Sequence, residues 1–303
     1  MNTQIKITRR RAALLGLLIG DAYGVPYEFF PPGIPLGEIR FPPPDGFERS
    51  HRNAPAGAWS DDGARALALL DALSLHGANV VIFERVFLRN LVGWFLAGHY
   101  AVDGLVFDAG THTSAVLTAK AQGACIESRM IALRPGALGN GSLMGVLPCA
   151  LMAKTDSAAV ARARASSRAT HGAIPCVEAC ALYTCVARAL LADVPWAKAW
   201  DAGVAMYHGM RDAVDAATLL VPDSEARRAT GYVLHGLNLA RIALTCDYPF
   251  ERGIQETISL GGDTDTNAAI VGGLLALRDG KVPPTLLARL AGPPWLDGFL
   301  EKL

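Results

Sequence analysis

The stretch from 259 to 270, SLGGDTDTNAAI, places an unusual number of oxygen-bearing side chains at the start of an apolar segment. The carboxylates of Asp263 and Asp265 and the hydroxyls of Thr264 and Thr266 stand between a glycine pair and a hydrophobic run. Carboxylate and hydroxyl oxygens without nearby histidine or cysteine are ligands that suit a hard cation, Mg²⁺ or Mn²⁺, better than zinc. This stretch is therefore a candidate half of a metal site.

A second stretch, WSDDG at 59–63, repeats the design with Ser60, Asp61 and Asp62 directly before a hydrophobic helical segment. Acidic residues there can instead be helix N-caps, because a carboxylate accepts hydrogen bonds from the free N–H groups of the first turn. One cap per helix is enough, however, and each of these helices receives two acids. Four carboxylates brought together in an apolar protein repel one another unless a cation compensates them. Double capping and a metal centre both remain open.

Three further motifs carry polar groups at expected turns. Gly139-Asn140-Gly141-Ser142 precedes an apolar segment, so its N–H groups could converge on a phosphate, although a plain turn has the same composition. His171 lies between two helical segments and could bind a ligand or cap a helix. Asp108, in FDAGTHT, opens another helix, where an N-cap is the alternative.

Composition indicates a globular, helical chain. It has 303 residues, of which 51% are hydrophobic and 18% charged. Alanine, leucine and glycine are abundant and β-branched runs are few, which predicts an all-α fold. Lys+Arg and Asp+Glu both number 28, so the net charge of zero provides no general attraction to nucleic acid or an anionic membrane.

Periodicity predicts a succession of helices without a repeat or a convincing linker, and we expect a single domain over 1–303. Glycines at 16, 20 and 24 form a small-residue stripe that would let another helix approach closely, and the proline-rich segment 26–44 is expected to be an irregular surface excursion. The predicted helices cover 12–23, 64–75, 80–96, 113–127, 157–169, 175–191, 196–210, 230–244 and 266–277.

The cysteines and the N-terminal segment indicate in which cellular compartment the protein is expected. Six cysteines in apolar helical text are expected to be buried, reduced thiols, although Cys176 and Cys180 share a helix face and could form a metal or redox pair. The start, KITRRRAALLGLLIG, is similar to a twin-arginine export signal, but Asp21 and the following motif favour a helix of the mature fold. No uninterrupted apolar run elsewhere reaches about 20 residues. We expect a cytoplasmic protein.

Taken in order, these motifs resemble the ADP-ribosylglycohydrolase family, which includes dinitrogenase reductase-activating glycohydrolase. The matching text is GLLIGDAYGVPYEF, WSDD, FDAGTHT, LGNGSLMGVLP, RATHGAIP, TGYVLHGLNLAR and SLGGDTDTNAAIVGG, which spans nearly the whole chain. The resemblance implies a single-domain, all-α orthogonal helical bundle with two divalent cations, Mg²⁺ or Mn²⁺, in a cleft.

The resemblance also implies roles for particular residues. Glu28 and Asp108 would be catalytic, moving protons near the metal centre and the scissile ribose. Substrate contacts would come from Gly139, Asn140, Gly141, Ser142, His171 and Tyr232. Metal ligands would be Ser60, Asp61, Asp62, Asp263, Asp265 and Thr266. The chain departs from the family pattern at Gly63, Thr111, His112 and Gly145, where threonine, asparagine, threonine and arginine are common.

The implied activity is hydrolysis of the C1″ glycosidic bond in mono-ADP-ribosylated proteins, with arginine the leading linkage and ADP-ribose the product. Two alternatives remain open. One is a catalytically silent binder of ADP-ribose, although such relatives tend to lose the acidic ligands, which are all present here. The other is a hydrolase of another linkage, to serine or to a small molecule.

Overall fold

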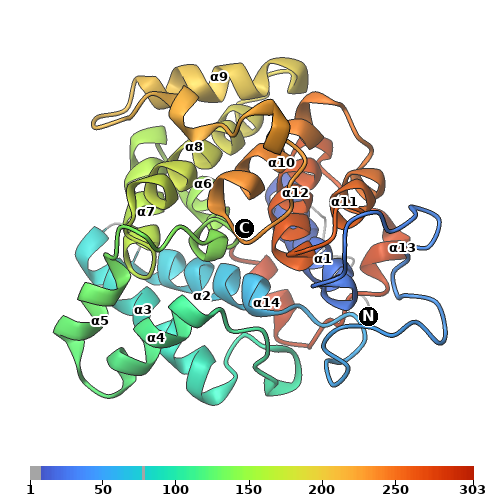
Figure 1. The fold of residues 1–303 in the computed structure, drawn as a ribbon. Coiled ribbons are helices and arrows are strands. Elements are labelled where there is room, and N and C mark those ends of the chain that lie inside the picture. Colours follow the sequence, from blue (N-terminus) through green and yellow to red (C-terminus); the bar gives the residue numbers. More distant parts are fainter. Residues whose placement is uncertain (1–7, 77–78) are drawn as a thin grey trace.

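The computed structural model describes residues 8–76 and 79–303, and this part of the chain is built from α-helices, short 3-10 turns and loops without a β-strand (Figure 1). The all-α prediction is confirmed. The helices are α1 (Arg9–Gly24), α2 (Asp61–His76), α3 (Val80–Ala97), α4 (Thr111–Ala121), α5 (Cys125–Ala132), α6 (Pro148–Met152), α7 (Asp156–Arg168), α8 (Ile174–Leu191), α9 (Trp196–His208), α10 (Val233–Thr245), α11 (Phe250–Ile258), α12 (Thr264–Asp279), α13 (Pro284–Leu287) and α14 (Leu296–Leu300).

Helices α1 and α12 pack against each other through their backbones at the centre of the bundle (Figure 1). A methyl group at Gly20 would collide with the main chain of Ala268, and one at Gly24 would collide with the main chain of Asp265. The predicted small-residue stripe is thus a helix-packing surface. Because the two backbones are this close, the C-terminal end of α1 lies beside the first turn of α12, where Asp265 stands.

Gly20→Ala should lower the free energy of unfolding by about 2–3 kcal/mol, because the added Cβ overpacks a rigid backbone contact. Gly37→Ala is the matched control, since a Cβ there meets nothing within 4 Å. Urea denaturation of both variants provides the measurement. An equal, small effect of the two substitutions would contradict the close approach of α1 and α12.

Most predicted helices agree with the structure to within about three residues at each end, but two of them depart from it in a way that matters for the site. The expected helix 113–127 is wrong as a single element, because α4 ends at Ala121 and α5 begins at Cys125, with Gly123 between them at φ +79°. The expected helix 230–244 begins only at Val233. Its predicted first residues instead pair with the segment 139–142, which we call the glycine loop, where Asn140 N donates to Gly231 O at 2.9 Å.

The proline-rich segment 26–44 is irregular after the short 3-10 turn Val25–Tyr27, as predicted, but it does not lie wholly on the surface. Ile39 and Phe41 are buried, and the Phe41 ring stacks on Tyr23 of α1 at a centroid distance of 5.1 Å. The Tyr23 hydroxyl also donates to Ile39 O at 3.1 Å. These contacts anchor the segment to the core.

The six cysteines are free, and four of them are buried as predicted. The expectation is wrong for Cys125 and Cys246, which are exposed because each lies next to a turn at a helix end. On α8, the Cys176 thiol donates to Ala137 O and Gly139 O at 3.4 Å, and the Cys180 thiol donates to Ser142 Oγ at 3.5 Å. These thiols support the glycine loop, and burial raises the pKa of Cys180 to about 11.

Helix α8 is long and apolar enough to span a membrane, but 78% of it is buried inside the bundle, as in the core helix of a folded protein. The apolar part of the signal-like N-terminus is likewise buried, as most of α1. Residues 1–7, which begin that signal-like segment, lie outside the described residues.

Candidate active site

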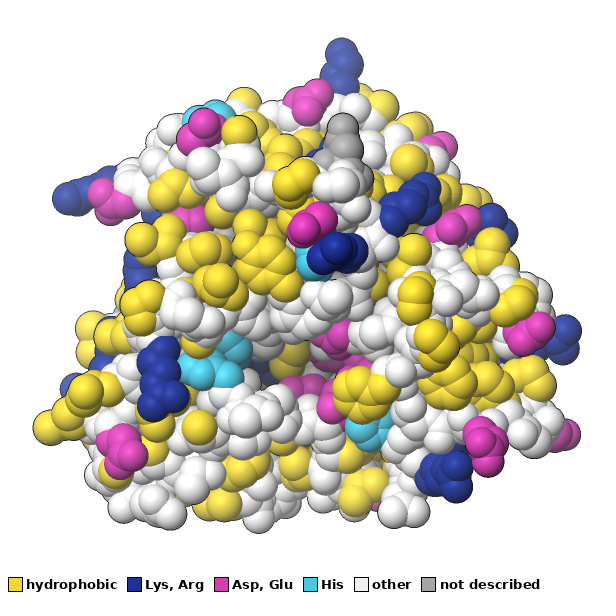
Figure 2. Space-filling model, viewed as in Figure 1, with side chains coloured by type: hydrophobic (Ala, Val, Ile, Leu, Met, Phe, Trp, Pro, Cys, Tyr) yellow, Lys and Arg dark blue, Asp and Glu magenta, His cyan; other side chains and the backbone are white. Residues whose placement is uncertain are grey.

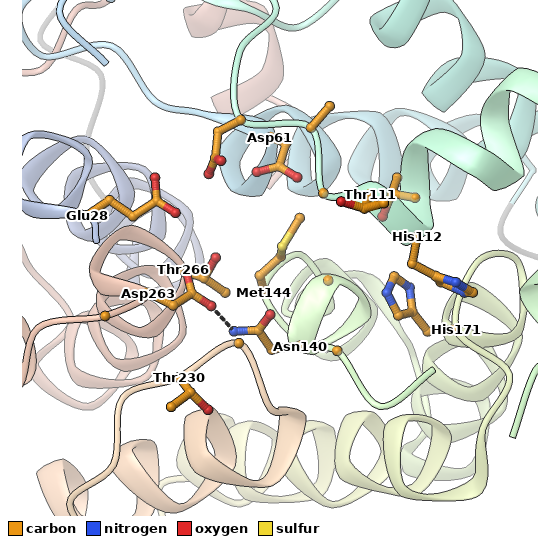
Figure 3. Close-up of a pocket in the computed structure, with 18 of the residues that line it drawn as sticks. Glu28, Asp61, Thr111, His112, Asn140, Met144, His171, Thr230, Asp263 and Thr266 are labelled. Carbon is orange, nitrogen blue, oxygen red and sulfur yellow. Dashed lines mark hydrogen bonds between the residues drawn. The ribbon is translucent and has the colours of Figure 1, made fainter. Parts of the chain in front are cut away.

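A cleft of about 620 Å³ opens on one face of the bundle, and its two ends differ in chemistry (Figure 2). Glu28, Asp61 and Asp263 line one end, whereas His112 and His171 line the other (Figure 3). Asn140 and Met144 lie between these ends. The cleft therefore suits an elongated ligand that is held by acidic groups at one end and by neutral polar groups at the other.

The acidic end contains two sets of three carboxylates, and Asp265 belongs to both sets. Oxygens of Asp21, Asp62 and Asp265 lie within 4.8 Å of one another, and so do oxygens of Glu28, Asp263 and Asp265. All except Asp263 are buried, and Asp263 is half-buried. Asp21 lies on α1, Asp62 on α2 and Asp265 on α12, whereas Glu28 follows the 3-10 turn after α1 and Asp263 is the N-cap of α12. The helix packing described above therefore brings these distant sequence motifs together.

Asp21 is a member of this cluster that the sequence analysis did not assign to the site. Its carboxylate accepts hydrogen bonds from Ser60 N at 2.9 and 3.0 Å and from Gly63 N at 2.8 Å. It thereby caps the first turn of α2 and fixes the positions of Asp61 and Asp62. The signal for this role was a buried acid at the end of an apolar helix, in GDAYG.

Packing explains why glycine, and no larger residue, stands at position 63. A Cβ at this position would lie 2.6 Å from the Trp59 ring and 2.7 Å from a methyl group of Leu18. A threonine, common at this position in the family that the sequence resembles, does not fit in this chain without movement of those side chains. Gly145 likewise leaves room for the buried side chain of Arg65, which a Cβ would approach to 2.8 Å.

Burial and mutual repulsion raise the pKa values of the clustered acids. Burial is the largest cause for Asp61, Asp62 and Asp265, whose pKa values lie well above the ordinary one. Burial likewise raises the pKa of Asp21 to about 7, and burial followed by repulsion from Asp108 raises that of Glu28 to about 10. Such a cluster favours either protons or a cation as its positive charge.

The donor set fits a divalent cation. Asp62 Oδ1 and Asp265 Oδ2 are buried and have no hydrogen-bond partner among the described residues. A buried carboxylate oxygen without a partner is costly, and an ion at the cluster would satisfy both. The two sets of carboxylates offer oxygens only, as expected for Mg²⁺ or Mn²⁺, whereas a third group of possible ligands, Glu28, His51 and Asp108, includes a histidine nitrogen.

Glu28 and Asp108 meet at the rim of the acidic end. The Glu28 carboxylate is hydrogen-bonded to His51 Nε2, which lies 4.0 Å from Asp108 Oδ1. Burial raises the pKa of Asp108 to about 6 and lowers that of His51. The predicted pair of proton-transfer residues is thus adjacent in space, with a histidine between them that the sequence analysis did not single out.

The glycine loop joins the two ends of the cleft. The Asn140 amide donates to Asp263 Oδ2 at 2.6 Å, so the loop is tied to the acidic cluster (Figure 3). A Cβ on Gly141 would lie 2.9 Å from the His171 ring, which explains why glycine stands there. Ser142 instead lies below the loop, where its hydroxyl accepts from Ser167 Oγ at 2.9 Å.

His112 and His171 form the other end of the cleft. Their rings meet edge to face with centroids 4.9 Å apart. His112 Nε2 donates to Thr170 O at 2.8 Å, and His171 Nδ1 lies 2.9 Å from Thr170 Oγ1. Burial lowers the pKa of both rings, that of His171 well below its usual value. Both are therefore neutral hydrogen-bonding groups at neutral pH.

The structure gathers most of the predicted site residues at this cleft. Those that line it are Glu28, Asp61, Asp108, Gly139, Asn140, Gly141, His171, Asp263 and Thr266. Ser60, Asp62 and Asp265 are buried beside the acidic end. The side chains of Ser142 and Tyr232 do not line it, since Tyr232 packs on His235 with ring centroids 5.1 Å apart. Their contacts to a substrate stay predictions.

Residues 2–303 match the family model of the ADP-ribosylglycohydrolases, and the chain belongs to this family of glycosyl-bond hydrolases. The fold is similar to that of a solved structure described as an ADP-ribosylglycohydrolase-related protein complex. The TM-score is 0.73 at 25% identity, with 97% of this chain and 95% of that chain covered.

Two curated bacterial relatives carry the name ADP-ribosylarginine hydrolase Tri1. The protein from Pseudomonas putida (strain GB-1) is 27% identical over 98% of this chain and 78% of its own length. The protein from Serratia proteamaculans (strain 568) is 24% identical over 98% of this chain and 76% of its own length.

Proposed function

We propose that this enzyme hydrolyses the C1″ glycosidic bond of mono-ADP-ribosylated protein side chains, with arginine as the linkage, and releases ADP-ribose. The observation that carries the proposal is that two sets of three carboxylates share Asp265 at one end of an elongated cleft. The names of the two curated relatives support arginine as the linkage.

In this proposal the acidic cluster holds two divalent cations, Mg²⁺ or Mn²⁺. The ligands would be Ser60, Asp61, Asp62, Asp263, Asp265 and Thr266, to which the position of Asp21 adds a further carboxylate. When bound, the cations would supply positive charge that stabilises the transition state and makes a water molecule more acidic. The shared position of Asp265 is what favours two ions over one.

Residues along the cleft would bind the substrate and transfer the proton. Gly139, Asn140 and Gly141 would hold the pyrophosphate, with His171 as a neutral donor beside them. Asp263 would orient that loop through its hydrogen bond to Asn140. Glu28 or Asp108 would move the proton, because burial holds the pKa of Asp108 near the range in which general acid–base catalysis is efficient.

The proposal includes one domain over 1–303, since the family match covers residues 2–303. It also includes a cytoplasmic location, which agrees with six free cysteines.

The test is release of free ADP-ribose from an arginine-ADP-ribosylated protein, measured with Mg²⁺, with Mn²⁺ and with chelator. We expect release with at least one cation and a loss of about a hundredfold or more on chelation, since the cluster then lacks its compensating charge. Release that chelator leaves unchanged would contradict the metal centre. Binding of ADP-ribose without release from any linkage would indicate a catalytically silent binder.

A further inference from the structure

Phe29 is an exposed aromatic side chain at the mouth of the cleft. It lines the cleft next to Glu28 and is 71% exposed, more than any other phenylalanine or tryptophan in the described residues. An exposed phenylalanine costs free energy that burial against a ligand would recover. The position therefore raises the question of what covers this ring.

The backbone at Phe29 fixes the direction of its Cα–Cβ bond. Phe29 has a φ of 65°, in the left-handed region that a β-carbon disfavours, and its N–H donates to Gly262 O at 2.7 Å. Gly262 N in turn donates to Phe30 O at 2.9 Å. A strained conformation that is held by two hydrogen bonds next to a site is typical of functional positioning.

Phe29 belongs to an aromatic rim, which we define as Phe29, His51 and Phe107. The Phe29 and His51 ring centroids are 6.0 Å apart, and those of His51 and Phe107 are 5.3 Å apart. His51 also connects the rim to the two carboxylates, since it is hydrogen-bonded to Glu28 and lies 4.0 Å from Asp108. Aromatic faces and carboxylates thus stand side by side.

This combination fits a planar cation. A guanidinium stacks on aromatic faces and pairs with carboxylates, and it does both better than an ammonium. A nucleotide fits this rim less well, because the pyrophosphate attached to the adenosine would lie against the Asp108 carboxylate and beside the acidic cluster. The opposite end, lined by the neutral rings of His112 and His171, has no carboxylate among the described residues that line it and provides the place for that anionic part.

We infer that the aromatic rim is the acceptor subsite, in which Phe29 stacks on the guanidinium of the modified arginine while Glu28 and Asp108 face its charge. The inference rests on the proposed function and assigns the part of the cleft that recognises the leaving group. Phe29 is here a specificity residue: it contacts the side chain that leaves and makes no bond to the reacting atoms.

The test compares Phe29→Leu with Phe29→Tyr, using ADP-ribosylarginine as substrate and ADP-ribose as a ligand that lacks the acceptor. Leucine removes the aromatic face but keeps an apolar side chain with a Cβ. We expect kcat/KM to fall about tenfold in Phe29→Leu, mainly through KM, which corresponds to one cation–π contact. Phe29→Tyr should restore most of kcat/KM, and the ADP-ribose affinity of both variants should stay within about twofold of the native value.

Ile126→Ala is the matched control, because Ile126 is an exposed apolar side chain (80%) that does not line the cleft. A native enzyme that releases nothing from ADP-ribosylarginine would overturn the proposed function itself. Native activity that is unchanged in Phe29→Leu would overturn only the acceptor subsite. Weaker ADP-ribose binding by Phe29→Leu would also overturn it, because the ring would then serve the nucleotide.

Discussion

Asp265→Asn should lower kcat for ADP-ribose release by about a thousandfold or more. Asp265 belongs to both sets of three carboxylates, so its loss affects both proposed ion positions at once. It is also fully buried, and its Oδ2 has no hydrogen-bond partner within the described protein. Removing a group that holds the charge-stabilising centre of a hydrolase commonly costs two to three orders of magnitude or more in rate.

Stability measurements separate this loss from unfolding. In chelator, burial raises the pKa of Asp265 well above its usual value, which favours the protonated side chain, and asparagine resembles that neutral form. The midpoint of thermal unfolding of Asp265→Asn in chelator should thus lie within a few degrees of the native value. The stabilisation that Mg²⁺ or Mn²⁺ gives the native protein should be absent from the variant.

Asp279→Asn serves as the control, since Asp279 ends the same helix and pairs with Arg278, at the end of α12 opposite the cleft. This control should keep both the activity and the metal-induced stabilisation. An Asp265→Asn enzyme with more than a tenth of native activity would contradict a shared carboxylate at the centre.

Local patterns in the sequence were sufficient for the fold class and for the acidic motifs that the structure brings close together. Apolar periodicity predicts helices independently of the tertiary structure, and acids before such helices are visible in the text. The Gly20 stripe could be read in the same way, because only a small side chain allows the backbone contact with Ala268.

Residues whose role depends on a distant partner could not be predicted in this way. Asp21 caps α2 across 39 and 42 residues of sequence, and His51 meets Glu28 across 23. Neither residue has a local motif that identifies its distant partner. The shortened start of α10 has the same cause, because the pairing of Gly231 with Asn140 is a tertiary contact that overrides helix propensity.

Without metal, the free energy of unfolding should fall as pH rises from about 5 to 7. The pKa of Asp21 is raised from 3.8 to about 7 and that of Glu28 from 4.5 to about 10, both mainly by burial. Between these values the folded chain keeps protons that the unfolded chain has released. Raising the pH therefore favours the unfolded chain, by about 1.4 kcal/mol per pH unit for each extra proton.

A bound cation should reverse the consequence of this titration, because metal binding needs the deprotonated carboxylates and its affinity rises with pH. We expect the metal-induced increase in the unfolding midpoint to be larger at pH 7.5 than at pH 5.5. Asp21→Asn removes one of the titrating carboxyl groups. In chelator, the free energy of unfolding of this variant should therefore fall less steeply with pH than that of the native protein. A native protein in chelator that gains stability from pH 5 to 7 would show that its buried acids are ionised and paired with positive charges of the protein. The acidic cluster would then need no cation to compensate its charge.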